Sequence, residues 1–210
     1  LETSPAWRLA GQRDMDRPEV GAAVANWYLV FHSAGCGLLE SEKDFPDFLR
    51  SESDALNAES IRETSTRLGM QHLPVWELAA RHIEALKHAM GSLPQVLNYN
   101  DFHWSNLALS RREEPLRAVV FDYGLLGVGL RYSDCRNVVG ALADAAKSAF
   151  WQEYGPVDER EAIRDEPASE LYALLVAASR ARFPNWAKPM LRRAQTGELD
   201  RSILRAVAII

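Results

Sequence analysis

The chain has 210 residues, of which 47% are apolar, and its net charge is −5 at pH 7. This length allows one substantial hydrophobic core, so we expect a single domain. The acidic balance argues against nucleic acid as a general partner, because surfaces that bind phosphate backbones are basic. No apolar run approaches the ~20 residues that span a bilayer and no signal peptide is visible, so we also expect no membrane partner.

The two cysteines, Cys36 and Cys135, are far apart in the sequence and belong to no recognisable motif. This pattern is typical of buried thiols in a reducing compartment rather than of a disulfide framework. We therefore expect a cytoplasmic protein.

The first helical pattern begins at the capping-box-like sequence DRPE (16–19) and ends at Gly35. Its apolar residues recur at helical spacing: Val20, Val24, Trp27, Tyr28 and Phe31. A second helix is predicted from Pro74, at a first helical position, to Gly91.

An acidic cluster follows the first helix, with only Lys43 and Arg50 as nearby cations. Its members are Glu40, Glu42, Asp44, Asp47, Glu52 and Asp54. We interpret it as a solvated acidic loop; the alternative is an acidic wall for a cationic ligand.

Three short apolar runs bounded by polar residues predict strands at 95–99, 106–110 and 117–121. Asp101, Asn106 and Asp122 then lie at strand ends. Phosphoryl transfer needs an acceptor for the proton of the attacking hydroxyl and oxygen ligands that hold Mg²⁺ against phosphates. One carboxylate, one amide oxygen and a second carboxylate are sufficient, although the same residue types also occur in ordinary polar turns.

The sequence YNDFHWSN (99–106) resembles the HxDxxxxN catalytic loop of the aminoglycoside phosphotransferase and choline kinase-like family. DYG (122–124) resembles the metal-binding motif of that family, and FHSAG (31–35) resembles its LHxxG. The resemblance implies an α+β, predominantly α-helical fold, the C-terminal lobe of a protein kinase-like fold with a small β-hairpin region that carries the catalytic and metal loops.

The resemblance also implies roles. Asp101 would be the catalytic base, and Asn106 and Asp122 would bind Mg²⁺ and through it ATP, the phosphoryl donor. The acceptor would be a hydroxyl of a small molecule. Asp134 resembles the aspartate that opens the helix after the metal loop, for which we expect a structural role.

Two features depart from the family. Tyr99 stands where histidine is usual, at a position that supports the loop. The N-terminal nucleotide-binding lobe, with its phosphate-covering loop and strand lysine, has no counterpart in the chain. GLLGVG (124–129) follows the metal aspartate, and we interpret it as a tight turn that uses positive φ. We therefore expect residues 1–210 to be one C-terminal lobe, inactive as a kinase when isolated.

Two alternatives remain open. One is a pseudokinase-like binding module, motivated by Tyr99 and the lobe that has no counterpart. The other is a hydrolase that uses Asp101, His103 and Asp122 around a metal, although no second histidine ligand is convincing and zinc is not expected. Further helices are predicted at 134–153, 168–182, 186–196 and 199–209, with breaks at Pro156, Pro167, Pro184 and Gly197.

Overall fold

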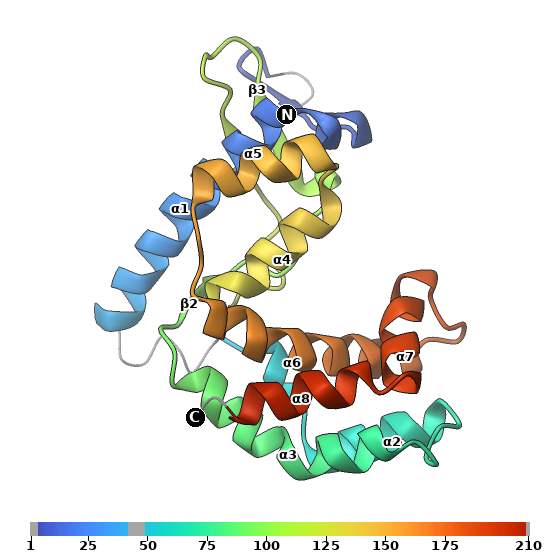
Figure 1. Ribbon diagram of the computed structural model, residues 1–210. Helices are drawn as coiled ribbons and strands as arrows, with labels where there is room; N and C mark the ends of the chain where they lie inside the picture. The colour runs from blue at the N-terminus through green and yellow to red at the C-terminus, as the bar shows by residue number, and fades with distance from the viewer. Residues whose placement is uncertain (1–3, 42–48, 209–210) are drawn as a thin grey trace. The chain divides into compact units, whose positions relative to one another are not determined.

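The computed structural model describes residues 4–41 and 49–208. The chain divides into two compact units, one made of Leu1–Arg50 with Gln95–Val157 and the other of Ser51–Pro94 with Asp158–Ile210 (Figure 1). Each unit has its own core of buried apolar side chains. The expectation of a single lobe stays a prediction.

In its described residues, the first unit combines three helices with short strands and single 3₁₀ turns. Its elements are β1 (Trp7–Leu9), η1 (Gln12–Asp16), α1 (Pro18–Ser41), β2 (Val96–Asn98), η4 (Trp104–Asn106), β3 (Leu107–Ser110), β4 (Ala118–Val120), β5 (Gly127–Gly129), α4 (Arg131–Ala141) and α5 (Asp144–Tyr154). Within the described residues its two cysteines are free thiols, and Cys135 is buried.

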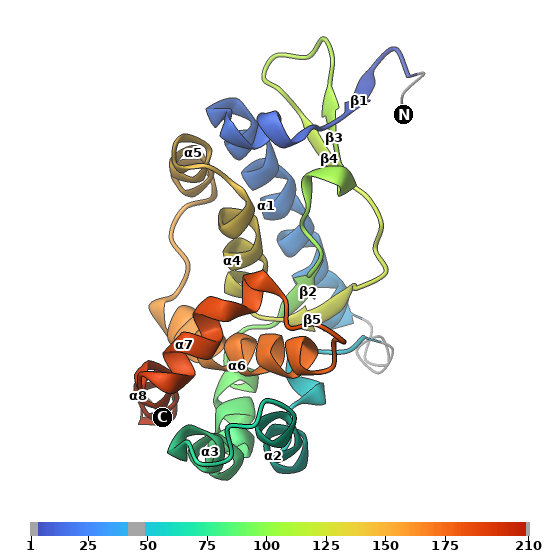
Figure 2. The ribbon, with the colours of Figure 1, turned by 90° about the vertical axis from the view of Figure 1, so that its right-hand side faces the viewer.

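The strands form two small antiparallel sheets, in the orders β1-β3-β4 and β2-β5 (Figure 2). The three predicted strands are confirmed. The tight turn predicted at 124–129 is present at Gly124 and Leu125, where Leu126 N donates to the carbonyl of Tyr123 at 3.1 Å. The positive φ predicted for it is wrong, because no glycine of this stretch has one, and Gly127 and Gly129 lie in β5. Glycine is needed there for space: a Cβ on Gly129 would collide with the side chain of Asn98, and one on Gly127 with the carbonyl of Arg50.

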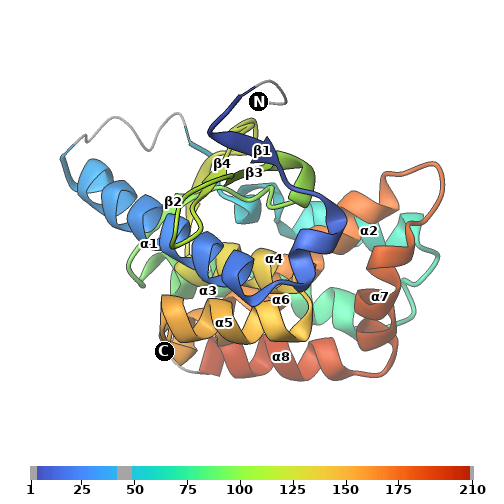
Figure 3. The same ribbon diagram turned by 90° about the horizontal axis from the view of Figure 1, so that it is seen from above.

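Helix α1 packs on α5 in the core of this unit (Figure 3). The predicted end at Gly35 is wrong, since α1 continues to Ser41. Gly35 serves a close approach instead, because a Cβ there would lie 2.8 Å from that of Leu97 in β2. By length and composition alone α1 could cross a membrane, a property it shares with the core helices of globular proteins. The expectation of no membrane partner stays a prediction.

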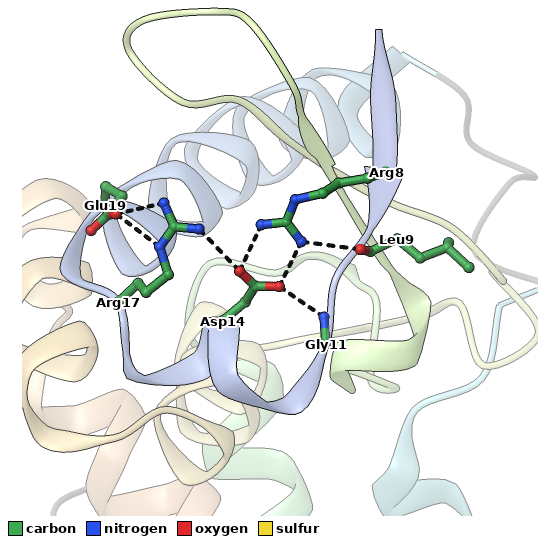
Figure 4. A network of polar contacts seen from close by, with 6 residues as sticks. All are labelled: Arg8, Leu9, Gly11, Asp14, Arg17 and Glu19. Carbon is green, nitrogen blue, oxygen red and sulfur yellow. Dashed lines mark hydrogen bonds and ion pairs between the residues drawn. The ribbon is translucent and has the colours of Figure 1, made fainter. Parts of the chain in front are cut away.

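A polar network joins β1 to the start of α1 (Figure 4). Both carboxylate oxygens of Asp14 accept hydrogen bonds from the Arg8 guanidinium at 2.7 Å. Asp14 also accepts from Gly11 N at 2.8 Å and from Arg17 at 3.1 Å. The hydrogen bonds from Arg8 are the largest reason that the pKa of Asp14 falls to about 2.

The second unit is helical wherever the structure describes regular elements. These are η3 (Glu52–Ala55), α2 (Ala58–Arg67), α3 (Pro74–Gly91), α6 (Glu159–Ala178), η5 (Asn185–Ala187), α7 (Lys188–Gln195) and α8 (Glu198–Ala208). The predicted helix from Pro74 to Gly91 is confirmed, whereas α2 was not predicted.

Two further predicted helix boundaries are wrong. The helix expected at 134–153 is two helices, α4 and α5, separated at Leu142 and Ala143. Pro167 does not end a helix but lies buried inside α6. Burial of Leu171 and Leu174 beyond it, in the core that α6 shares with α3 and α8, supplies packing energy that offsets the missing backbone donor. The predicted α+β, predominantly helical fold class is confirmed.

Candidate active site

The catalytic-loop residues Asp101 and Asn106 lie together between β2 and β3. Asn106 Nδ2 donates hydrogen bonds to Oδ2 of Asp101 at 3.1 Å and to its carbonyl oxygen at 3.3 Å. Because the amide nitrogen is used in this way, Oδ1 of Asn106 is directed elsewhere, and among the described residues it has only a long 3.4 Å contact from Ser105 Oγ. Each side chain therefore keeps one oxygen available for a ligand.

The metal-loop residue Asp122 follows directly from the hairpin of β3 and β4. Phe121 N donates a hydrogen bond to the carbonyl of Asn106 at 3.0 Å. The backbone hydrogen bonding between β3 and β4 therefore extends to Phe121, the residue before Asp122. The Asp122 side chain is exposed, and within residues 4–41 and 49–208 its carboxylate makes no hydrogen bond or ion pair. Such a carboxylate is free to bind a cation.

Tyr99 lies close to all three of these residues. Its hydroxyl donates to the carbonyl of Phe121 at 2.6 Å. Burial is the main reason that the pKa of Tyr99 rises to about 12; the side chain of Asn106 opposes the rise, and the charges of Asp101 and Asp122 add to it. The phenol thus keeps its proton at neutral pH and can donate it to the carbonyl of Phe121.

Two residues of the site have left-handed backbone conformations. Asn100 has φ 63° and Asp122 has φ 68°. Positive φ is uncommon outside glycine, although asparagine and aspartate tolerate it best, and it concentrates at functional sites. One of these residues precedes the expected base and the other is the expected metal ligand.

Asp134 anchors the catalytic loop from the first turn of α4. Its fully buried carboxylate accepts hydrogen bonds from Tyr99 N at 2.8 Å, Asn100 N at 2.9 Å and Asn98 Nδ2 at 3.3 Å. His32 Nε2 lies 3.1 Å from the same carboxylate. Asp134 is buried in the helix and is not its N-cap residue, which is Leu130.

His32 is the site-supporting residue that sequence reasoning missed. Its Nδ1 lies 2.7 Å from the hydroxyl of Tyr154, so it connects α1 with α4 and α5. The match of FHSAG (31–35) to the family pattern contained this histidine and was the available signal.

The hydrolase alternative requires several His, Cys, Asp or Glu side chains around one metal ion. Among the residues that the structure describes, no group of three His, Cys, Asp or Glu side chains could hold a metal ion. His103 Nδ1 instead lies 2.8 Å from Ser105 Oγ and accepts a hydrogen bond from Ser105 N. Mg²⁺ needs fewer protein ligands, because phosphate and water oxygens complete its shell, and an amide oxygen with one carboxylate is the kind of donor set it uses.

The acidic cluster is described only in part. Glu42, Asp44 and Asp47 lie outside the described residues. Glu40 belongs to α1, and Asp54 accepts a hydrogen bond from Ser51 N within η3.

Comparison with known proteins identifies the family of the chain. A family model, APH, described as a phosphotransferase enzyme family, matches residues 1–166, which contain Asp101, Asn106 and Asp122. No curated protein and no solved structure matches the chain. Since the family match covers well over half of its residues, the chain belongs to the phosphotransferase enzyme family.

Proposed function

We propose that the chain is the catalytic-loop and acceptor-binding part of an ATP- and Mg²⁺-dependent phosphotransferase that acts on a hydroxyl of a small molecule. The observation that carries the proposal is the hydrogen bond from Asn106 Nδ2 to Asp101. It fixes the Asp101 carboxylate through one oxygen and turns Asn106 Oδ1 toward a ligand. The exposed carboxylate of Asp122 is the second oxygen ligand.

Asp101 is the proposed general base. The acceptor oxygen forms a bond to the γ-phosphorus, the bond from that phosphorus to the β–γ bridging oxygen breaks, and the hydroxyl proton passes to the unbound oxygen of Asp101. Asn106 and Asp122 would hold Mg²⁺, which when bound supplies charge compensation at the phosphate oxygens. Asn106 also orients the base, so one amide serves both functions.

The register of the first sheet supports a place for the nucleotide base. Leu9 pairs with Ala108, and Ala108 pairs with Val119, so these residues form one apolar row across β1, β3 and β4. Leu9 and Val119 are each 38% exposed and flank Ala108, which is buried, so a base would rest on the two outer side chains. Ala108 is two residues beyond Asn106, which makes the row a suitable floor for a base whose phosphates reach Asn106 and Asp122.

A separate nucleotide-binding lobe would complete the site. The sequence contains no glycine-rich loop followed by a strand lysine ahead of the catalytic loop. These parts cover the nucleotide phosphates in kinases of this general design. The proposed partner therefore supplies the phosphate cover while this chain supplies base and metal ligands.

The function is tested by ATP turnover across a panel of hydroxylated and cationic small molecules, with the nucleotide-binding lobe present. Asp101→Asn is the catalytically impaired control, because its asparagine can still accept the hydrogen bond from Asn106 but is a poor proton acceptor. We expect at least one acceptor to be phosphorylated by the wild type, with a rate about 10²–10⁴-fold lower in the variant. Nucleotide binding without phosphorylation of any acceptor would favour the pseudokinase-like binding module.

A further inference from the structure

The metal loop is held on both sides of Asp122 by two adjacent residues of the catalytic loop. The Tyr99 hydroxyl donates to the carbonyl of Phe121 at 2.6 Å. Asn100 Nδ2 donates to the carbonyl of Leu125 at 3.2 Å. The two acceptors are the residue before Asp122 and the third residue after it.

Both donors are fixed by the protein core. The backbone N–H groups of Tyr99 and Asn100 donate to the two carboxylate oxygens of the fully buried Asp134. The Tyr99 ring also contacts Trp27 and Tyr123 edge-on, with centroids 6.0 and 5.7 Å away. A shift of either donor would therefore disturb buried contacts.

A fixed support is needed because Asp122 has φ 68°, a conformation that a loop of non-glycine residues does not favour by itself. The Asp122 carboxylate has no hydrogen bond or ion pair with the described residues that would hold it. Its position must then come from the backbone on either side.

We propose that Tyr99 and Asn100 form a two-point clamp that positions Asp122 to bind Mg²⁺. The magnesium part of this inference rests on the proposed function, whereas the clamp itself does not. Tyr99 and Asn100 are positioning residues, since neither needs to touch a substrate. Where related catalytic loops carry histidine, this chain reaches the metal loop with a phenol, so Tyr99 is compatible with a competent enzyme.

The clamp is tested by hydrogen exchange of the metal-free chain, with the peptide that covers residues 121–126 as the readout. Tyr99→Phe removes only the donor oxygen. Asn100→Gly removes the side-chain donor and retains a residue that tolerates positive φ. The control is Tyr172→Phe, which removes a phenol hydroxyl from helix α6. We expect each clamp variant to exchange about threefold to tenfold faster in this peptide, as loss of one hydrogen bond implies, and the control to match the wild type.

The second measurement is the Mg²⁺ concentration that gives half-maximal turnover in the enzyme with its nucleotide-binding lobe. Tyr99→Phe and Asn100→Gly should each raise this Mg²⁺ concentration several-fold and leave the KM for the acceptor unchanged. Unchanged exchange at 121–126 in Asn100→Gly, or faster exchange with an unchanged Mg²⁺ requirement, would overturn the proposal. If the wild type phosphorylates nothing but exchange increases in the variants, the clamp stands and the proposed function fails.

Discussion

Asn106 Nδ2 lies 3.1 Å from Oδ2 of Asp101, so a single hydrogen bond couples the proposed base to the proposed metal ligand. The bond fixes which atom of each side chain remains for a substrate. It leaves the second Asp101 oxygen for the acceptor proton and Asn106 Oδ1 for the metal.

Replacement of Asp134 by asparagine should destabilise the first unit and slow catalysis together. The asparagine amide can accept from only one of Tyr99 N and Asn100 N, and its NH₂ group faces the other donor. We expect the free energy of unfolding to fall by about 1.5–3 kcal/mol, the usual range for hydrogen bonds to a charged group. Urea denaturation measures this loss, and turnover at a temperature where the variant is folded measures the effect on the loop.

The control for this change is Asp144→Asn at the first turn of α5, whose side chain is fully exposed. It should alter stability by no more than about 0.5 kcal/mol. An Asp134→Asn protein as stable as the control would show that the buried carboxylate does not anchor the catalytic loop.

Two glycines of α1 should respond to alanine in opposite ways. A Cβ on Gly21 would collide with the carbonyl of Ala146 in α5, whereas one on Gly37 has nothing within 4 Å. Gly21→Ala should therefore destabilise by about 1–3 kcal/mol through overpacking. Gly37→Ala should stabilise by about 0.5–1 kcal/mol, because alanine is the better helix former. Chemical denaturation of the two variants checks the sign, and changes of the same sign would contradict the packing of α1 on α5.

Glu170 should make the stability of the second unit depend on pH. Burial raises its pKa to about 7, although Arg193, with Nε 3.0 Å from Oε1, opposes the shift. The nearby charges of Glu166 and Glu198 raise it further. Because the folded state binds this proton more tightly than the unfolded state, the stabilisation is complete below about pH 4.5 and is lost as the pH rises through 7.

The variant Glu170→Gln should remove this dependence, which we expect to be on the order of 1–3 kcal/mol between pH 4.5 and 7.5. Glu159→Gln is the control, because this exposed carboxyl lies at the start of the same helix. Urea denaturation at both pH values measures the difference. A Glu170→Gln protein with the same pH dependence as the wild type would mean that Glu170 does not bind the proton.

The local parts of the site could be predicted from the sequence, and the long-range parts could not. Asp101, Asn106 and the strands around them follow from short patterns. The network of His32 could not be read in this way, because its partners Asp134 and Tyr154 are 102 and 122 positions away. Strand β5 was missed for a similar reason, since Gly129 is required by the approach of Asn98 and not by a turn.

Helix boundaries failed where packing outweighs local preference. Pro167 is a helix breaker by sequence, yet it lies inside α6 because the residues beyond it are buried. Gly35 has the low helix propensity typical of a helix end, but α1 continues past it. A glycine stands at this position because Leu97 leaves no room for a side chain.

The central claim is that Asp101 is the general base and Asp122 a Mg²⁺ ligand. It is tested most directly by comparing turnover and Mg·ATP binding of Asp101→Asn and Asp122→Asn, with the nucleotide-binding lobe present and a small molecule that the wild type phosphorylates. We predict that Asp101→Asn lowers kcat by about 10²–10⁴-fold and leaves the calorimetric Kd for Mg·ATP nearly unchanged, because a general base acts mainly in the transition state. Asp122→Asn should weaken Mg·ATP binding as well. An Asp101→Asn enzyme that phosphorylates the acceptor at the wild-type rate would contradict the account.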